Sequence, residues 1–545
     1  MNRQGRAAAR WLALPPLLSS RPLADAALAA LLGAVQTLAY DHTAAWPLPI
    51  LTLAVLAWHL QAAGPRRAAL LGWCYGTAWL TAGTWWIFIS LHRYGGLPAP
   101  LAMAAVLGLA AALSLYMAAA CAAYARWRRD TGWDALLFAA LWLLAELARG
   151  VIFTGFPWLA VGYSQLDGWL APLAPWVGVY GIGAVVALIA AVAVAAVSAP
   201  RGVAVNAPRR VTVNAPRRVT VGAPRRVAGR AGPALLVLAL LLLPRLGPQD
   251  FTRPAGEISV ALLQTNVSQD EKFATDRMPE ALAWTARELL VARADLVLAP
   301  ETAVPLLPGQ LAEFAPGYWA SLVAHFQTSG SRALVGVPLG DYERGYTNSV
   351  AGLSPAPAYR YDKTHLVPFG EFVPQGFHWF TEMMNIPLGD FARGVRNPPS
   401  FSVQGQRVAP NICYEDLFGE ELARRFVDAA QAPTVFANIS NIAWFGPSAI
   451  DTQHLNISRM RTLEFQVPMV RATNTGATAV IDHRGRVTAR LAPYTRGVLQ
   501  GRVQGREGVT PYARWAELAG LWPLCLAALA VVLAAVWLPR RLHAN

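Results

Sequence analysis

Eight apolar runs constrain the fold of this chain more than any other feature, because each approaches the length that crosses a bilayer. A helix needs about 20 apolar residues to span the hydrocarbon core, and most runs satisfy this, although the first, second and seventh are short. Hydrophobic residues make up 55% of the chain and charged residues 14%, so we expect a multi-span membrane protein. The runs cover approximately residues 24–40, 47–63, 67–91, 97–126, 133–153, 174–199, 232–246 and 517–538.

Arginine placement predicts the topology, because short cytoplasmic connections are enriched in Lys and Arg. The N-terminus, the second, fourth and sixth connections and the C-terminal tail are rich in arginine, whereas the first, third and fifth connections hold only Arg93. We therefore expect both ends in the cytoplasm and residues 247–516 on the opposite side. A cleaved signal peptide is the alternative for the N-terminus, but Pro15 and Pro16 interrupt its apolar stretch, so we expect an anchored chain.

The sixth connection, residues 200–231, contains an Asn-Ala-Pro-Arg-Arg-Val-Thr-Val repeat and eight arginines without an acidic residue. We interpret it as a disordered, proline-punctuated positive-inside segment rather than a nucleic-acid or lipid site. It carries much of the net charge of +14, so that charge says nothing about the substrate. The expected domains are a membrane domain at 1–246, an outer domain at 247–516, and a last span with a cytoplasmic tail at 517–545.

Cys413 is the one cysteine outside the apolar runs. Cys74, Cys121 and Cys525 lie within them, where a free thiol packs as a small hydrophobe. No second cysteine in the outer domain can form a disulfide with Cys413. A solitary thiol in an oxidising compartment risks oxidation, and nucleophilic catalysis is the usual reason to keep one.

The outer domain alternates strand-like and helix-like patterns, which predicts an α/β fold. Glu301 follows one expected strand and Cys413 another, and ligand sites in α/β sheets form where strands end. The expected strands are Ile258–Gln264, Ala294–Ala299, Arg332–Val337, Arg407–Ile412 and Pro433–Asn438, and the expected helices are Met278–Ala292 and Glu415–Ala429.

Lys363 is conspicuous because the chain has 46 Lys and Arg residues, of which only Lys272 and Lys363 are lysine. An ammonium is a compact donor with a tunable pKa, whereas a guanidinium is a planar fork that stays charged. A cysteine nucleophile needs a base, which a buried Glu301 can supply, and its tetrahedral intermediate needs an oxyanion donor, which Lys363 can supply. His365 is the alternative base, and an ordinary surface pair is the alternative role of Lys363.

Three strings combine these residues: Ala299-Pro-Glu-Thr-Ala, Tyr361-Asp-Lys-Thr-His-Leu-Val-Pro-Phe-Gly-Glu-Phe-Val-Pro and Asn411-Ile-Cys-Tyr-Glu. They resemble the nitrilase-superfamily domain of the bacterial apolipoprotein N-acyltransferases. The resemblance covers nearly the whole chain, since Thr154-Gly-Phe-Pro-Trp in the membrane half and Asn438-Ile-Ser-Asn downstream also match. The order of these strings within a frame of seven spans, a domain and one span makes the resemblance specific.

The resemblance implies eight transmembrane helices plus a nitrilase-type αββα sandwich, periplasmic and catalytic, at the bacterial inner membrane. It implies that Cys413 attacks an ester of a membrane phospholipid to form a thioester acyl-enzyme. The α-amine of a diacylglyceryl-cysteine on an apolipoprotein would then take the acyl chain. Glu301 would be the general base and Lys363 the oxyanion donor, with Glu371, Tyr414 and Glu415 completing the site. No cofactor and no nucleic acid is implied, and the protein would be monomeric.

The candidate substrate-binding residues are Trp158, Trp444, Phe445, Phe273 and Asn348. The tryptophans could instead be interface anchors, which is what most membrane tryptophans are. Phe273 itself departs from the family, which commonly has tryptophan there.

Other features have two interpretations each. Ile442 stands where the family often has aspartate, which bears on loop positioning near the neighbouring tryptophan. Glu146 and Arg149 could form a structural ion pair or belong to a functional site, because ionisable residues at that depth are functional candidates. Glu371 could act by pairing with Lys363 to fix its rotamer.

Two other function classes stay open. A membrane-tethered amidase or nitrilase would use the same three residues on a small polar amide, but a soluble substrate gives no reason for the eight-span frame. A transporter or scaffold would carry paired charges through several spans, and only Glu146 and Arg149 supply them. The nine histidines lack ligand-like spacing and no glycine-rich loop opens a helix, so we expect no metal.

Overall fold

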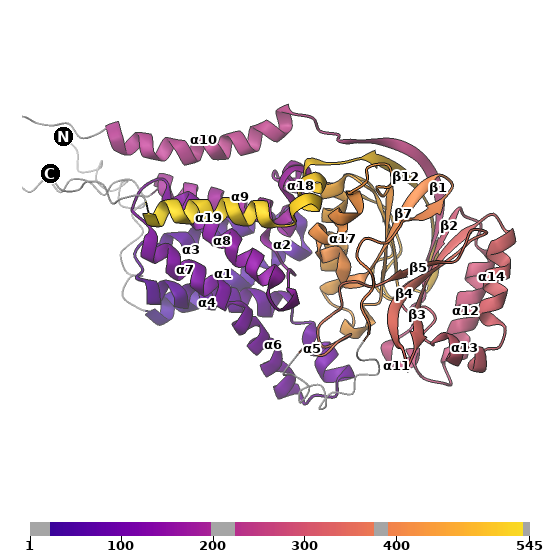
Figure 1. The fold of residues 1–545 in the computed structure, drawn as a ribbon. Coiled ribbons are helices and arrows are strands. Elements are labelled where there is room, and N and C mark those ends of the chain that lie inside the picture. The colour runs from indigo at the N-terminus through magenta and orange to yellow at the C-terminus, as the bar shows by residue number, and fades with distance from the viewer. Residues whose placement is uncertain (1–21, 198–223, 375–390, 538–545) are drawn as a thin grey trace, which may run out of the picture.

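The computed structural model describes residues 22–197, 224–374 and 391–537 (Figure 1). The N-terminal helices form one half of the molecule and two β-sheets with their covering helices form the other, while the C-terminal helix α19 returns along the helical half. The main helices of the membrane half are α1 (Pro22–Gln36), α2 (Leu38–Asp41), α3 (Pro47–Leu60), α4 (Pro65–Gly83), α6 (Ala99–Leu113), α7 (Leu115–Trp127), α8 (Asp134–Val151), α9 (Ala174–Val197), α10 (Pro224–Leu246) and α19 (Trp522–Trp537).

Five helical segments of the described residues are long and apolar enough to cross a membrane. A sixth is added if α18 (Pro511–Ala519) and α19, which are bent by 84°, count as one span. The expected eight transmembrane helices are therefore not confirmed. The five segments are Pro22–Asp41, Thr43–Leu60, Ala99–Trp127, Asp134–Thr154 and Ala171–Val197.

The other expected spans are helical but less apolar or shorter than their runs indicated. α4 begins with Arg66 and Arg67, and it continues through glycine, tyrosine and tryptophan residues that lower its hydropathy. α10 begins before the expected span, and only Gly232–Leu242 within it is an apolar helix segment. The last run is broken by Gly520, whose positive φ of 55° turns the chain before α19 starts.

α4 is nevertheless central to the packing of the membrane half. Its Tyr75 and Trp79 are fully buried. A Cβ built on Gly33 of α1 would lie 2.0 Å from the carbonyl oxygen of Tyr75, so the two helices approach closely there. Small residues at such crossings are the usual device of membrane helices, because they let backbones pack together.

The other half contains two six-stranded sheets. Their strand orders are β12-β1-β2-β3-β4-β5 and β11-β10-β9-β8-β7-β6. The strands are β1 (Thr252–Gln264), β2 (Leu296–Leu298), β3 (Arg332–Asp341), β4 (Gly345–Leu353), β5 (Tyr359–Asp362), β6 (Phe401–Val403), β7 (Gln406–Ile412), β8 (Val435–Ser440), β9 (Met469–Thr473), β10 (Ala479–Ile481), β11 (Val487–Arg490) and β12 (Gly497–Gly508). All five expected strands are present, as β1, β2, β3, β7 and β8.

The sheets and helices stack in four layers, α, β, β and α. Val260 and Leu262 of β1 pack between the sheets with Val408 of β7. Alternate residues of β1, Ala261 and Leu263, face the outer helices α12 (Met278–Val291), α13 (Pro308–Phe314) and α14 (Tyr318–Thr328). Because both faces of the central strands are buried, strands such as β2 and most of β3 are almost continuously apolar. The helices α16 (Gly419–Ala423), α17 (Ile450–Phe465) and α18 cover the second sheet.

The predicted helix over Glu415–Ala429 is wrong. The chain instead makes a 3-10 turn over Cys413–Leu417, the short α16, and a second 3-10 turn over Arg424–Phe426. Cys413 has a left-handed φ of 53°, and the Glu415 carboxylate accepts the Ile412 N–H at 2.7 Å. A side chain that folds back on the preceding strand favours a tight turn over a continuous helix.

α17 lies between the two halves (Figure 1). α9 is kinked at Gly178, whose φ of 65° interrupts the helical hydrogen bonding. The Glu464 carboxylate of α17 accepts the Val179 N–H at 2.7 Å, and Arg461 donates to the same carboxylate at 3.0 Å. Because Glu464 accepts a backbone N–H that the kink leaves free of the helix, the α/β half caps the kink of the membrane helix. Both charged side chains are fully buried.

Candidate active site

Glu301, Lys363 and Cys413 follow three different strands and meet at one edge of the sandwich. Glu301 comes three residues after β2, Lys363 directly after β5, and Cys413 directly after β7. The Lys363 Nζ lies 3.4 Å from Glu301 Oε1, and the thiol of Cys413 interacts electrostatically with both. The structure thus brings together the three residues that the sequence singled out.

The Glu301 carboxylate is held by three donors. Its Oε1 accepts from the Asn348 amide at 2.7 Å and from Lys363 at 3.4 Å. Its Oε2 accepts the backbone N–H of Asn441 at 2.7 Å. With its side chain only 8% exposed, Glu301 is a fixed and largely dry carboxylate, as a general base requires.

Lys363 lies between two carboxylates. Its Nζ is 2.8 Å from Glu371 Oε1, and Asn348 donates to that same Glu371 oxygen at 2.7 Å. Burial opposes the charge, but Glu371 and Glu301 outweigh it and hold the pKa of Lys363 above its usual value. The amine is therefore a permanent ammonium. Its contact with Glu371 is the one expected if Glu371 fixes the rotamer of Lys363.

Cys413 is half-buried and strained, which suits a positioned nucleophile. Burial and the neighbouring Glu301 raise the pKa of the thiol well above its usual value, although Lys363 opposes them. The raised pKa favours the neutral thiol. A cysteine that acts as a nucleophile then needs a base to take its proton, because only the thiolate is strongly nucleophilic.

Glu415 ties the cysteine turn to the lysine segment. Its Oε1 accepts the backbone N–H groups of Thr364 at 2.6 Å and His365 at 3.1 Å. Its Oε2 accepts the Tyr361 hydroxyl at 2.6 Å and the N–H that precedes Cys413. Glu415 thus acts as a brace between the two segments, because their backbone and tyrosine donors occupy both of its oxygens.

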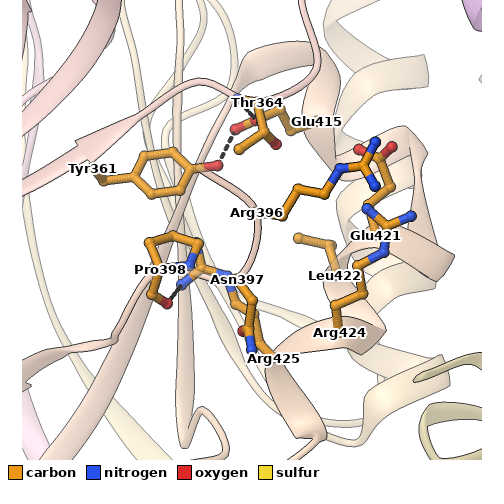
Figure 2. A pocket seen from close by; sticks show the side chains of 10 residues that line it. All are labelled: Tyr361, Thr364, Arg396, Asn397, Pro398, Glu415, Glu421, Leu422, Arg424 and Arg425. Carbon is orange, nitrogen blue, oxygen red and sulfur yellow. Dashed lines mark hydrogen bonds between the residues drawn. The ribbon is translucent and has the colours of Figure 1, made fainter. Parts of the chain in front are cut away.

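A pocket lies on the far side of this brace (Figure 2). Tyr361, Thr364 and Glu415 line one side, while Arg396, Arg424 and Glu421 lie on the other. The guanidinium of Arg425 reaches the Tyr361 ring, 5.1 Å from its centroid. Cys413, Glu301 and Lys363 are not among its lining residues, so this pocket backs the site rather than opening onto the thiol. Its ten lining residues are Tyr361, Thr364, Arg396, Asn397, Pro398, Glu415, Glu421, Leu422, Arg424 and Arg425.

His365, the alternative base, turns away from the three-residue group. Its Nδ1 lies 3.2 Å from Glu421 Oε2, and its ring stacks on Phe418 with centroids 3.5 Å apart. Tyr414, the residue after the nucleophile, donates its hydroxyl to the Gly155 carbonyl of the membrane half at 3.0 Å.

Two of the candidate substrate-binding residues belong to one aromatic cluster. The rings of Trp158 and Phe445 lie 5.1 and 4.7 Å from the ring of Trp86. Trp444 contacts Tyr94 instead, with centroids 5.7 Å apart. Trp158 also donates to Gln453 at 2.7 Å, and Gln453 links the two halves.

The two remaining candidates differ in their surroundings. Asn348 donates to the carboxylates of Glu301 and Glu371 and is almost fully buried. Phe273 is half-buried beside Lys272, at the end of α11 (Gln269–Lys272).

The Glu146 and Arg149 pair holds the segment that carries Trp158. The two charged groups are 3.9 Å apart and fully buried. Glu146 accepts the Val161 N–H at 2.8 Å, while Arg149 donates to the carbonyl groups of Phe156 and Trp158 at 2.6 Å each. These contacts are those of a structural ion pair.

α17 contributes a contact to the turn of Cys413 to which the sequence assigned no role. His454 Nε2 lies 3.2 Å from the Cys413 carbonyl and 3.1 Å from Asp416 Oδ1. Burial raises the pKa of Asp416, but His454 and Arg471 outweigh it and leave the pKa lowered. Asp416 is three residues after Cys413, so its proximity to the thiol could be predicted from the sequence. The contact with α17 could not, because it depends on the tertiary fold.

Two facing sheets with outer helices, and a Glu, Lys and Cys group at the strand ends, define a carbon-nitrogen hydrolase domain joined here to a helical membrane bundle. Residues 259–512 match the carbon-nitrogen hydrolase family model, and residues 32–192 match the model of the apolipoprotein N-acyltransferase N-terminal domain.

Full-length relatives narrow this class further. The apolipoprotein N-acyltransferase of Verminephrobacter eiseniae is 52% identical over 87% of this chain and 89% of its own length. That of Ralstonia nicotianae is 45% identical over 95% of this chain and 94% of its own length. The chain belongs to the apolipoprotein N-acyltransferase family.

Proposed function

We propose that this protein moves a fatty acyl chain from a membrane phospholipid, through a thioester on Cys413, to the α-amine of a diacylglyceryl-cysteine at the N-terminus of apolipoproteins. Membership in a family named for acyl transfer to apolipoproteins supports the N-acyltransferase activity. The observation that carries the mechanism is the buried Glu301, Asn348, Lys363 and Glu371 group beside a neutral, half-buried thiol.

In the first step, Glu301 takes the proton of the thiol as the sulfur attacks the ester carbonyl carbon of the phospholipid. The carbonyl oxygen becomes an oxyanion, which the Lys363 ammonium stabilises together with the backbone N–H that follows Cys413. When the intermediate collapses, the carbon–oxygen bond of the ester breaks. The glycerol oxygen leaves with the proton from Glu301, giving a lysophospholipid and the acyl-enzyme.

In the second step, the neutral α-amine of the acceptor attacks the thioester carbonyl. The same ammonium stabilises the second oxyanion, and Glu301 accepts the proton that the amine loses on forming the amide. The carbon–sulfur bond breaks, and the proton returns to the thiolate. Because the thiol has a raised pKa, each departure of the sulfur is best coupled to reprotonation.

We infer the cellular arrangement from the same resemblance and from the arginine pattern. The membrane helices place the α/β domain at the bilayer, where both lipid substrates are found. The expected arrangement is an inner-membrane protein with cytoplasmic ends, a membrane domain at 1–246, a periplasmic catalytic domain at 247–516 and a last span within 517–545. The bundle contributes directly to the site, since Tyr414 and Trp158 contact both halves.

The deciding experiment is intact-mass spectrometry of the detergent-purified protein after incubation with phospholipid. We expect a mass increase of one acyl chain that hydroxylamine removes, because hydroxylamine cleaves thioesters. Cys413→Ala should show no adduct, whereas Cys525→Ala, which removes a thiol within α19, should behave as wild type. A folded wild-type protein without an adduct across several phospholipids would exclude the phospholipid-donor mechanism and favour hydrolysis of a soluble amide.

A further inference from the structure

Lys272 is the other of the two lysines in the chain, and it too lies at the candidate active site. It ends α11, the short helix that follows β1, and it is 5% exposed. Its Nζ donates to the backbone carbonyl of Glu301 at 3.1 Å. A buried lysine is expensive unless its charge is used, so this position calls for an explanation.

α11 contacts Glu301 by two routes. Lys272 holds the Glu301 carbonyl, and Gln269 accepts from the Asn441 side chain at 3.2 Å. The backbone N–H of that same Asn441 donates to the Glu301 carboxylate. The turn itself is tight, because Thr302 has a φ of 48° and a Cβ on Gly336 would lie 2.2 Å from the Pro300 carbonyl oxygen. The position of the Glu301 side chain thus depends on α11.

The charges of the site leave a role for a second ammonium. Glu301 and Glu371 carry two negative charges, and Lys363 contacts both. When Glu301 takes the thiol proton, the thiolate and Glu371 carry two negative charges against the one positive charge of Lys363, so one negative charge is left uncompensated. Lys272 interacts electrostatically with both Glu301 and Cys413. A positive charge near a thiolate favours its formation, because it offsets the cost of the negative charge in a dry site.

We propose that Lys272 is a positioning residue of this site, whose amine fixes the Glu301 turn and whose positive charge compensates the Cys413 thiolate. The inference rests on the proposed role of Cys413 as nucleophile. Burial lowers the pKa of Lys272 to about 7, whereas the negative charges of Glu301 and Cys413 raise it. Formation of the thiolate and retention of the Lys272 proton therefore support each other.

The test is the pH dependence of Cys413 alkylation by iodoacetamide, followed by peptide mass spectrometry on the full-length protein in detergent. Lys272→Gln keeps a donor for the Glu301 carbonyl but removes the charge. We expect its alkylation profile to move to higher pH, with a rate about tenfold below wild type at a given pH, as one unit of thiol pKa implies. Arg277→Gln removes an exposed charge from the same segment and should leave the profile unchanged.

A lysine with only a structural role would lower the melting temperature without moving the alkylation profile. A folded Lys272→Gln protein with the wild-type profile would overturn the proposal. If Lys272→Gln does not fold, Lys272→Arg decides: a wild-type profile supports charge compensation, and a displaced one overturns it. The alkylation needs neither lipid nor acceptor, so its outcome is independent of whether phospholipid proves to be the acyl donor.

Discussion

The Lys363 amine occupies a space fitted to one ammonium. Its side chain is 1% exposed and its Nζ lies between the carboxylates of Glu371 and Glu301. A guanidinium is larger and planar, so it cannot take the same place without displacing one of them. We expect Lys363→Arg to slow acyl-enzyme formation by about a hundredfold or more, the scale of losing one oxyanion donor.

This prediction is checked by the rate of the hydroxylamine-labile mass increase in a time course. The matched control is Arg287→Lys, the reverse exchange at an exposed position, which should leave the rate unchanged. Retention of more than a tenth of the wild-type rate in Lys363→Arg would contradict the assigned role.

Asp416 links the active-site turn to protein stability. It is fully buried with His454 and Arg471, and their charges leave its pKa below the usual value. A carboxyl whose folded pKa is depressed stabilises the protein above its unfolded pKa, and this stability is lost as pH falls through the folded value. We expect Asp416→Asn to be less stable by about 3 to 5 kcal/mol near neutral pH, because the buried Arg471 guanidinium loses its anionic partner.

The measurement is thermal unfolding in detergent at neutral pH and well below pH 4, because the folded pKa of Asp416 lies below its usual value. The difference between wild type and Asp416→Asn should shrink as the pH is lowered. An equal difference at both pH values would mean that the charge of Asp416 does not carry the effect.

At this scale the sequence was informative where residue types were rare. The convergence of Cys413, Lys363 and Glu301 could be anticipated because the lone thiol and the carboxylate each followed an expected strand and because lysine is scarce in this chain. The contact of His454 with the Cys413 carbonyl could not, because it depends on how α17 crosses the second sheet. Lys272 is as rare in composition as Lys363, but it lies outside the three strings that carried the resemblance.

Among the elements, the segment after β7 is the one that local pattern misjudged. Its residues have helical spacing, yet the Glu415 side chain folds back onto the strand end and onto the segment after Lys363. Propensity describes a residue with its neighbours along the chain, whereas the bond from Thr364 comes from a segment 51 residues away. The buried strands were predictable because both of their faces are apolar, which leaves a continuous pattern.

The same bonds make a prediction for Glu415. A glutamine has one acceptor oxygen instead of two and would point an N–H₂ group at backbone donors. We expect Glu415→Gln to lower both the melting temperature and the rate of Cys413 acylation, the latter by at least about tenfold, since buried donors lose a charged acceptor. Glu343→Gln, at an exposed turn, is the control. An unchanged acylation rate in Glu415→Gln would show that the brace is not required.

In the whole molecule, the two halves are joined through buried charges as well as apolar contacts. Arg461 and Glu464 of α17 are fully buried where α17 meets the kink of α9. Removing one member of a buried ion pair strands the other, whereas removing both is far less costly. We expect Arg461→Leu to lower the melting temperature strongly and the double variant Arg461→Leu, Glu464→Leu to recover much of the loss.

A double-mutant cycle on melting temperature in detergent checks this coupling. Additive effects of Arg461→Leu and Glu464→Leu would contradict it. The sequence did not predict this interface, and the expected count of eight spans is not confirmed for a related reason. Composition identifies apolar runs, but packing and bends such as the one at Gly520 decide where each helix ends.

The hydrogen bond from Tyr414 to Gly155 has a consequence for reach. Gly155 lies just beyond α8, an 18-residue helix that is about 27 Å long at 1.5 Å per residue and largely buried in the bundle. Tyr414, the residue after Cys413, is therefore hydrogen-bonded to the segment that follows a long, buried helix. For an enzyme that acts on lipids, this link means that the helical bundle fixes the position of the sulfur, so that a lipid substrate has to reach the sulfur there.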